Sequence, residues 1–160
     1  MALGDNTLRS AAGNSQRGRN PYMVQTTLNW ATALSDKGSA LAAADVIPVI
    51  AVPKGTMVLN AGIEVDTATD GSTFTVDLGM VDADVFVDGF DATSAAAVVA
   101  QNPAAYQPVM AVADDNIDVT IATLSGGAVT SGKFRIWAVL MDCTDIGDTA
   151  ANEVDRDTLA

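Results

Sequence analysis

Four aspartates stand close together in the run DADVFVDGFD, at Asp82, Asp84, Asp88 and Asp91. Calcium prefers oxygen ligands, and a loop of alternating aspartates can offer several carboxylates. The spacing is not that of an EF-hand loop, because the bidentate glutamate is missing and a strand pattern runs through the middle. The pattern favours solvated turn acids, with a calcium site as the alternative.

A second acidic group, Asp114, Asp115 and Asp118, is typical of a turn followed by the start of a strand. Two carboxylates flanking a sugar can hydrolyse a glycosidic bond. Such sites usually line their groove with several aromatic side chains, and most of the few aromatic residues here fall at core-facing strand positions. We therefore do not expect an aspartate-pair enzyme.

Histidine is absent from the chain, which excludes Ser-His-Asp, Cys-His and His-zinc chemistry. Cys143 is the only cysteine and has no basic neighbour in sequence, so it is expected to be an inert thiol rather than a nucleophile. The glycines form neither a GxGxxG nor a GxxxxGK phosphate loop. The sequence predicts a protein that is not an enzyme and needs no cofactor.

The net charge is −12, from 20 acidic and 8 basic residues. A surface this negative repels nucleic-acid phosphate and anionic lipid, so neither is expected as a partner. No apolar run has the length of a signal peptide or a membrane span. The expected location is the cytoplasm, or something assembled there.

The body is expected to be all-β, because Val, Ile and Thr are plentiful while the chain has only two Glu and three Lys. The length suits one domain. A loop or short helix is predicted at 35–44 and a helix at 93–100. Eight strands are predicted from alternation and turn signals, at 22–30, 45–52, 56–65, 72–78, 84–90, 106–112, 116–124 and 133–141.

Individual residues allow more specific predictions. Pro48 cannot donate to a strand ladder and is expected at a sheet edge or a bulge. A turn is expected at 53–55, and a bulge or bend at Ala61 and Gly62. In the strand at 84–90, Val85 and Val87 are expected on one face and Phe86 on the other. Alternation likewise places one set of residues on a single face in each of three other strands: Phe74, Val76 and Leu78; Ile117, Val119 and Ile121; and Phe134, Ile136, Ala138 and Leu140.

Eight short antiparallel strands predict a jelly-roll-like sandwich in preference to a closed barrel. Open sheet edges are a pairing hazard, so a chain with few lysines is expected to cover them by forming oligomers.

The two chain ends differ from the body in charge. Residues 1–20 carry +2, residues 21–142 carry −10 and residues 143–160 carry −4. We interpret them as a basic flexible N-terminal arm, a folded body and an acidic C-terminal tail, with both ends extended. Arg9, Arg17 and Arg19 are candidate partner-binding residues, expected to pair with an acidic surface on a neighbouring copy or another protein. A plain disordered terminus is the alternative.

Several runs resemble a group of small head proteins of tailed bacteriophages, the capsid decoration or cement proteins. They are DVIPVIAVPKGTMVLNAGIEV, STFTVDLG, DVFVDGFDA, ADDNIDVTIATLSGG and KFRIWAVLMD, which together span roughly residues 45–142. The resemblance implies a jelly-roll fold, a homotrimer and binding to the major capsid protein on the outside of the head. Neither end of the chain matches the group.

The sequence thus predicts a virion structural protein that binds the outer capsid surface and bridges capsomers, assembled in the host cytoplasm. Two alternatives remain. One is another virion part, such as a head-fibre base or a tail-associated protein. The other is a carbohydrate-binding module, which would need aromatic side chains exposed on one sheet face.

Overall fold

A computed structural model describes residues 21–93, 99–100 and 108–143 of the 160-residue chain. The basic arm at 1–20 and most of the acidic tail, 144–160, lie outside the described residues, so their predicted extension remains a prediction. No helix among the described residues is long and apolar enough to cross a membrane. The elements, in chain order, are β1 (Tyr22–Asn29), α2 (Trp30–Lys37), β2 (Val46–Val52), β3 (Thr56–Thr67), β4 (Thr73–Gly79), β5 (Val87–Asp91), β6 (Val99–Ala100), β7 (Val109–Met110), β8 (Asp115–Ser125) and β9 (Lys133–Asp142).

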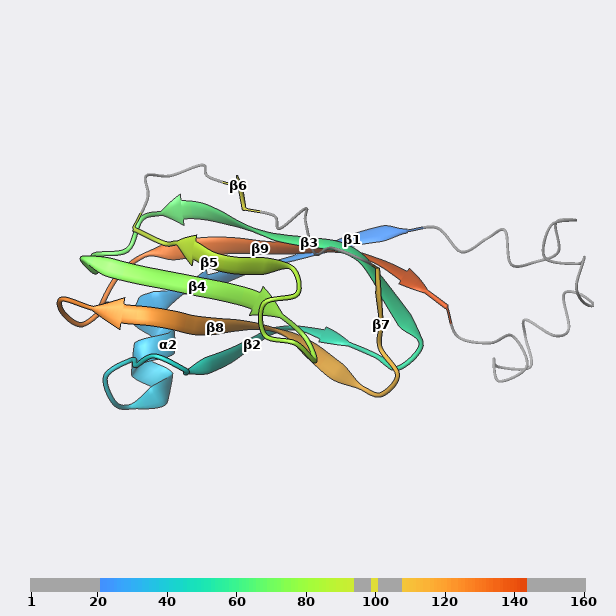
Figure 1. Cartoon of the computed structure of the whole chain (residues 1–160), viewed down its shortest axis with the longest axis horizontal. Coiled ribbons are helices and arrows are strands. Elements are labelled where there is room, and N and C mark those ends of the chain that lie inside the picture. Colours follow the sequence, from blue (N-terminus) through green and yellow to red (C-terminus); the bar gives the residue numbers. More distant parts are fainter. Residues whose placement is uncertain (1–20, 94–98, 101–107, 144–160) are drawn as a thin grey trace, which may run out of the picture.

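The strands form two antiparallel sheets packed face to face (Figure 1). The first sheet has the order β1-β9-β3-β6, with the two-residue strand β7 on the same edge of β3 as β6. The second sheet has the order β2-β8-β4-β5. Strands close in sequence are split between the sheets, as in two interlocked Greek keys, so the four-on-four sandwich has jelly-roll order. The predicted all-β jelly-roll-like sandwich is confirmed.

The core lies between the sheets and follows the predicted alternation. The predicted inward sets on β4, β8 and β9 are all buried. Trp30 is fully buried and meets Phe74 and Phe134 edge-on, with ring centroids 4.8 and 5.3 Å apart. Such edge-to-face pairs add to the stability gained from burying the rings. These strands fold as they do because one face of each is continuously apolar.

Helix α2 begins earlier than the loop or short helix predicted at 35–44. The Asn29 side chain accepts a hydrogen bond from the Ala31 backbone nitrogen at 3.0 Å and so caps the helix. The helix ends at Lys37 and is capped by Gly38, which has a left-handed backbone (φ 67°) and whose nitrogen donates to the carbonyls of Leu34 and Ser35. The strand predicted at 22–30 therefore ends one residue early, because Asn29 starts a helix there.

The helix predicted at 93–100 is wrong at its C-terminal end. Val99 and Ala100 form β6, opposite Glu64 and Ile63 of β3. Pairing with an available strand edge outweighs the weak helix preference of an Ala-rich segment. Residues 94–98 lie outside the described residues.

The bulge predicted at Ala61 and Gly62 is misplaced. These residues pair regularly with Ala138 and Trp137 of β9, while the register shifts between Val58 and Asn60 and again between Val65 and Thr67. Small side chains there suit close packing and do not interrupt the ladder.

Two local predictions are confirmed, one for Pro48 on β2 and one for the turn between β2 and β3. Pro48 lies on β2, an edge strand, beside a register shift. The turn at 53–55 is closed by a hydrogen bond from the Thr56 nitrogen to the Pro53 carbonyl, with Gly55 at φ 83°.

The face assignment in the strand predicted at 84–90 is wrong. Phe86 and Val87 are consecutive, yet both are buried, and β5 begins only at Val87. Residues 80–86 fold back over the end of β4, where the Phe86 nitrogen donates to the Leu78 carbonyl at 3.0 Å. An irregular segment need not alternate, because its side chains are not held by a ladder.

Candidate functional site

The acidic run after β4 does not converge on one point. Asp84 beside Asp82 raises the pKa of Asp82, because the two carboxyls share a hydrogen bond and repel each other when both are charged. Asp91 instead accepts hydrogen bonds from the nitrogen and the hydroxyl of Thr93, at 2.9 and 2.6 Å. Within 21–93, 99–100 and 108–143, no group of three or more acidic or cysteine side chains could hold a metal ion. Asp82 and Asp84 lie in the irregular segment before β5, whereas Asp88 and Asp91 lie on β5 itself.

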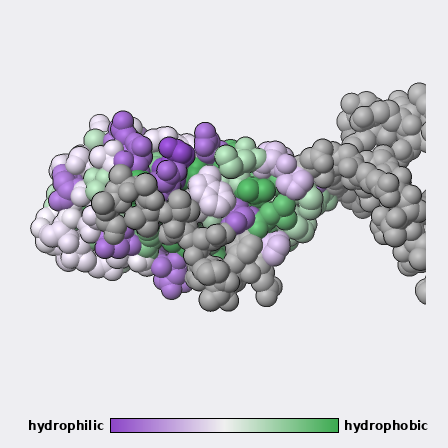
Figure 2. Space-filling model, turned by 90° about the horizontal axis from the view of Figure 1, so that it is seen from above, coloured by the Kyte–Doolittle hydropathy of each residue, from purple (hydrophilic) through white to green (hydrophobic). Residues whose placement is uncertain are grey.

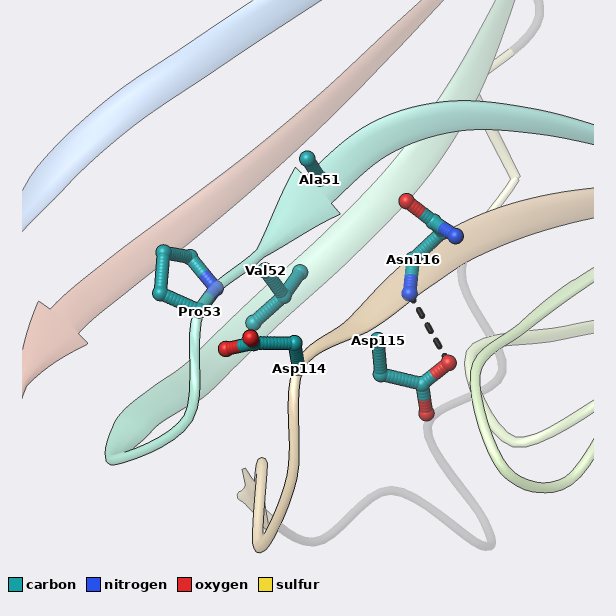
Figure 3. Close-up of a pocket in the computed structure, with 6 residues that line it drawn as sticks. All are labelled: Ala51, Val52, Pro53, Asp114, Asp115 and Asn116. Carbon is teal, nitrogen blue, oxygen red and sulfur yellow. Dashed lines mark hydrogen bonds between the residues drawn. The ribbon is translucent and has the colours of Figure 1, made fainter.

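Asp114 and Asp115 of the second acidic group border a hollow of about 450 Å³ at the end of the body where β2 runs into β3 (Figure 3). Figure 3 shows the Asp114 and Asp115 carboxylates pointing in different directions. The Asp114 carboxylate accepts a hydrogen bond from the backbone nitrogen of Lys54 at 2.9 Å, and the Asp115 carboxylate accepts one from the backbone nitrogen of Asn116 at 2.8 Å. These carboxylates hold backbone in place and do not face each other as a catalytic pair would.

A smaller hollow of about 290 Å³ lies between α2 and β2. Its charged pair, Lys37 and Asp45, joins the end of the helix to the start of the strand, and Lys37 also donates to the Ala40 carbonyl at 2.8 Å. The hydrogen bond from Lys37 lowers the pKa of Asp45. The pair has a clear structural role in closing the loop after α2.

Cys143 follows β9, where its nitrogen donates to the Gly55 carbonyl at 2.8 Å and its thiol to the Met141 carbonyl at 3.6 Å. Its contacts link the end of β9 to the β2–β3 turn.

The outer face of the second sheet is polar. Asp77 lies opposite Thr120, and Asp118 lies opposite Gly79. Partial burial raises the pKa of Asp77, and the nearby charges of Asp88 and Asp84 act in the same direction. Burial, with Asp115 nearby, also raises the pKa of Asp118. This face suits contact with water.

The outer face of the first sheet carries a cluster of apolar side chains over the half where β1 begins and β9 ends, although the polar Asn60 lies opposite Val139 there. Met57 lies opposite Met110 on one side and Met141 on the other. Met23 lies opposite Val139 on β1 and β9. We call these five residues the methionine face. Met23 is 63% exposed and Met110 38% exposed, while the other three are half-buried.

Figure 2 views the molecule from above, the side on which Figure 1 draws the first sheet. Hydrophobic colour gathers toward the end of the body that carries the methionine face, and hydrophilic colour is stronger toward the other end. Exposed apolar patches of this kind mark interaction surfaces. This patch was not predicted from the sequence, although β9 signals it: Trp137, Val139 and Met141 are apolar on the outer face of a strand whose inner face is also apolar.

The candidate partner-binding residues Arg9, Arg17 and Arg19 lie outside the described residues, and their role remains a prediction. The aromatic platform that a carbohydrate-binding module would need is not formed by the described part of the chain, where Trp137 is half-buried on the first sheet and Tyr22 lies at its edge.

No protein-family model matches the chain, and no curated protein matches it. Solved structures do. A chain in the cyanophage Pam1 capsid asymmetric unit has a TM-score of 0.60 at 17% identity, over 88% of this chain and 97% of that one. A chain in the capsid of Ralstonia phage GP4 has a TM-score of 0.53 at 17% identity, over 79% and 86%. A chain in the acidic stable capsid structure of Helicobacter pylori bacteriophage KHP30 has a TM-score of 0.52 at 14% identity, over 78% and 89%.

The likeness is one of fold. At these identities it supports the jelly-roll sandwich and fixes no residue's role. The Pam1 match covers 88% of this chain and 97% of that one, so the likeness extends over most of both chains.

Proposed function

We propose that this chain is a virion structural protein without enzymatic activity, a capsid decoration protein of a tailed bacteriophage. The observation that carries the proposal is the match of 78–88% of the chain to chains of similar fold in three phage capsid structures. The resemblance of residues 45–142 to the decoration proteins points the same way.

We place the protein on the outside of the head because of its charge. A chain with net charge −12 is repelled by packaged nucleic acid on the inside of a shell. The polar outer face of the second sheet, with Asp77 and Asp118, suits exposure to solvent. Assembly takes place in the host cytoplasm, where the shell is built.

The mechanism of the proposed function is bridging. Copies of the protein, as homotrimers, bind the major capsid protein of adjacent capsomers, and each added interface stabilises the shell by mass action. Arg9, Arg17 and Arg19 contribute charge-assisted hydrogen bonds to acidic groups across these contacts. Exposed pairs of this kind contribute little each, so several are needed.

The test of the proposed function adds purified protein back to particles of the encoding phage that lack it. Full-length protein should reach high occupancy, while protein lacking residues 1–20 should bind less. A triple Arg→Ala variant at positions 9, 17 and 19 should lose part of the binding, and raised salt should remove the share made by exposed pairs. Failure of the full-length protein to bind would refute the decoration function, and equal occupancy for all three proteins would show that the body makes every contact.

A further inference from the structure

The methionine face is an unusual surface for a chain this acidic. The charged residues on the outer side of the first sheet stand at the opposite end, where Glu64 and Arg135 form an ion pair at 3.0 Å and Lys133 begins β9. Within the described residues, the methionine face itself holds no ionisable group. Methionine side chains are flexible and polarisable, so such a face can adapt to an irregular partner.

We propose that a second copy of this chain covers the methionine face, so that copies associate through it. The distribution of charge favours this occupant. Two copies that met through the second sheet would bring Asp77 and Asp118 against their counterparts, whereas the five residues of the methionine face carry no carboxylate. Like charges placed together across an interface cost several kcal/mol.

The chain ends support the same arrangement. Met23 is the second residue of β1 and Met141 is the last but one of β9, so both chain ends leave the body beside this face. Copies that associate here bring their ends together at one end of the oligomer. Several arms presented together would bind a shell with higher avidity than a single arm. The gain in avidity rests on the proposed function, whereas the contact between copies does not need a particle.

The size of the face limits the strength of the contact. A standard interface uses about 20–30 residues on each side, and the methionine face supplies five. Asp142 follows Met141 and Asp114 lies four residues after Met110 in sequence, so this part of the chain carries negative charge that attracts the arginines of a neighbour's arm. We therefore expect association of roughly micromolar strength, with part of it contributed by residues 1–20.

The experiment is sedimentation velocity on the full-length chain and three double variants. Met23→Glu with Met110→Glu puts two carboxylates on the face. Val46→Glu with Val81→Glu adds the same charge at residues that are 56% and 80% exposed but lie outside the face. Met23→Leu with Met110→Leu keeps the face apolar. Thermal melting checks that all four proteins fold.

At about 100 μM, where a contact of micromolar affinity is saturated, the wild-type, Leu and Val46/Val81 proteins should be oligomers. The Met→Glu variant should associate at least tenfold more weakly. A monomeric wild-type protein, or equal association of the Met→Glu variant and its charge-matched control, would overturn the proposal. A fifth protein that lacks residues 1–20 completes the set. If it is monomeric while the Met→Glu variant still associates like the wild type, residues 1–20 make the contact and the proposal is overturned.

Particle binding separates this inference from the proposed function. Copies that associate through the face but do not bind particles would support the inference and refute the decoration function. If the protein is monomeric and its Met→Glu variant loses particle binding, the methionine face contacts the shell rather than a second copy. That result overturns the inference and leaves the decoration function standing.

Discussion

Asp70 and Thr130 are 60 residues apart in sequence, yet the Asp70 carboxylate accepts hydrogen bonds from both the nitrogen of Thr130, at 2.8 Å, and its hydroxyl. A third bond comes from the Ser131 nitrogen at 3.1 Å. Together they hold the segment before β9 against the turn before β4. These bonds stabilise the ionised carboxylate and lower the pKa of Asp70 to about 2.

Asp70 should therefore make stability depend on pH. Since its pKa is lower in the folded chain than its usual 3.8, its contribution is present above about pH 4 and is lost as the pH falls toward 2. Asp70→Asn should lower the free energy of unfolding at pH 7 by about 1 kcal/mol, a modest value because the carboxylate is exposed to solvent. The melting temperature should fall by roughly 2–4 °C. The difference in stability between the variant and the wild-type protein should disappear between pH 4 and pH 2. A difference that does not change with pH would contradict the role given to the Asp70 carboxylate.

Trp30 should contribute strongly to the stability of the folded chain. Trp30→Ala should cost about 3–5 kcal/mol in the free energy of unfolding, because it empties a buried site between Phe74 and Phe134. Trp30→Phe should cost much less, since the Trp30 Nε1 has no hydrogen-bond partner among the described residues and no bond is lost. Trp137→Ala is the comparison, because Trp137 is half-buried on an outer face. Denaturant unfolding measures all three, and equal costs for Trp30→Ala and Trp137→Ala would refute the prediction.

Gly79 should tolerate no side chain. A β-carbon there would lie 1.9 Å from the Asp82 carbonyl oxygen and 2.3 Å from the Ala83 carbonyl carbon, both backbone atoms. Gly79→Ala should therefore cost about 3 kcal/mol by forcing residues 80–86 off β4. The control is Gly38→Ala, where a β-carbon meets nothing and only the left-handed backbone costs about 1 kcal/mol. Calorimetry should show the larger drop for Gly79→Ala, and the reverse order would show that the segment is free to move.

Metal removal should leave stability unchanged. The carboxylates of Asp82 and Asp91 are engaged with Asp84 and Thr93 rather than gathered around one point. A chelator should therefore produce no shift in melting temperature, and added calcium none either. A drop of around ten degrees with chelator would assign the run a calcium site after all.

The sequence was most informative where one face of a strand is continuously apolar. Phe74 on β4 and Phe134 on β9 are buried as alternation predicts, because a period of two fixes which side chains share a face. The turn at 53–55 and the edge position of Pro48 also follow from the local chemistry of proline and glycine.

Features that depend on which strands are neighbours could not be predicted from the local sequence. Val99 becomes a strand because the edge of β3 is there to pair with, and nothing in its own segment signals that edge. The methionine face is similar: Met57, Met110 and Met141 are far apart in sequence, and only the register of β3 with β7 and β9 aligns them.

The most direct test of the decoration function is a pair of cryo-electron microscopy reconstructions, one of the native particle and one of particles from which this chain has been deleted. The predicted result is a jelly-roll-sized density, in clusters of three copies, that stands on the outer surface across adjacent capsomers and is absent from the deletion particle. An unchanged outer surface, or loss of density only at the tail, would contradict the account.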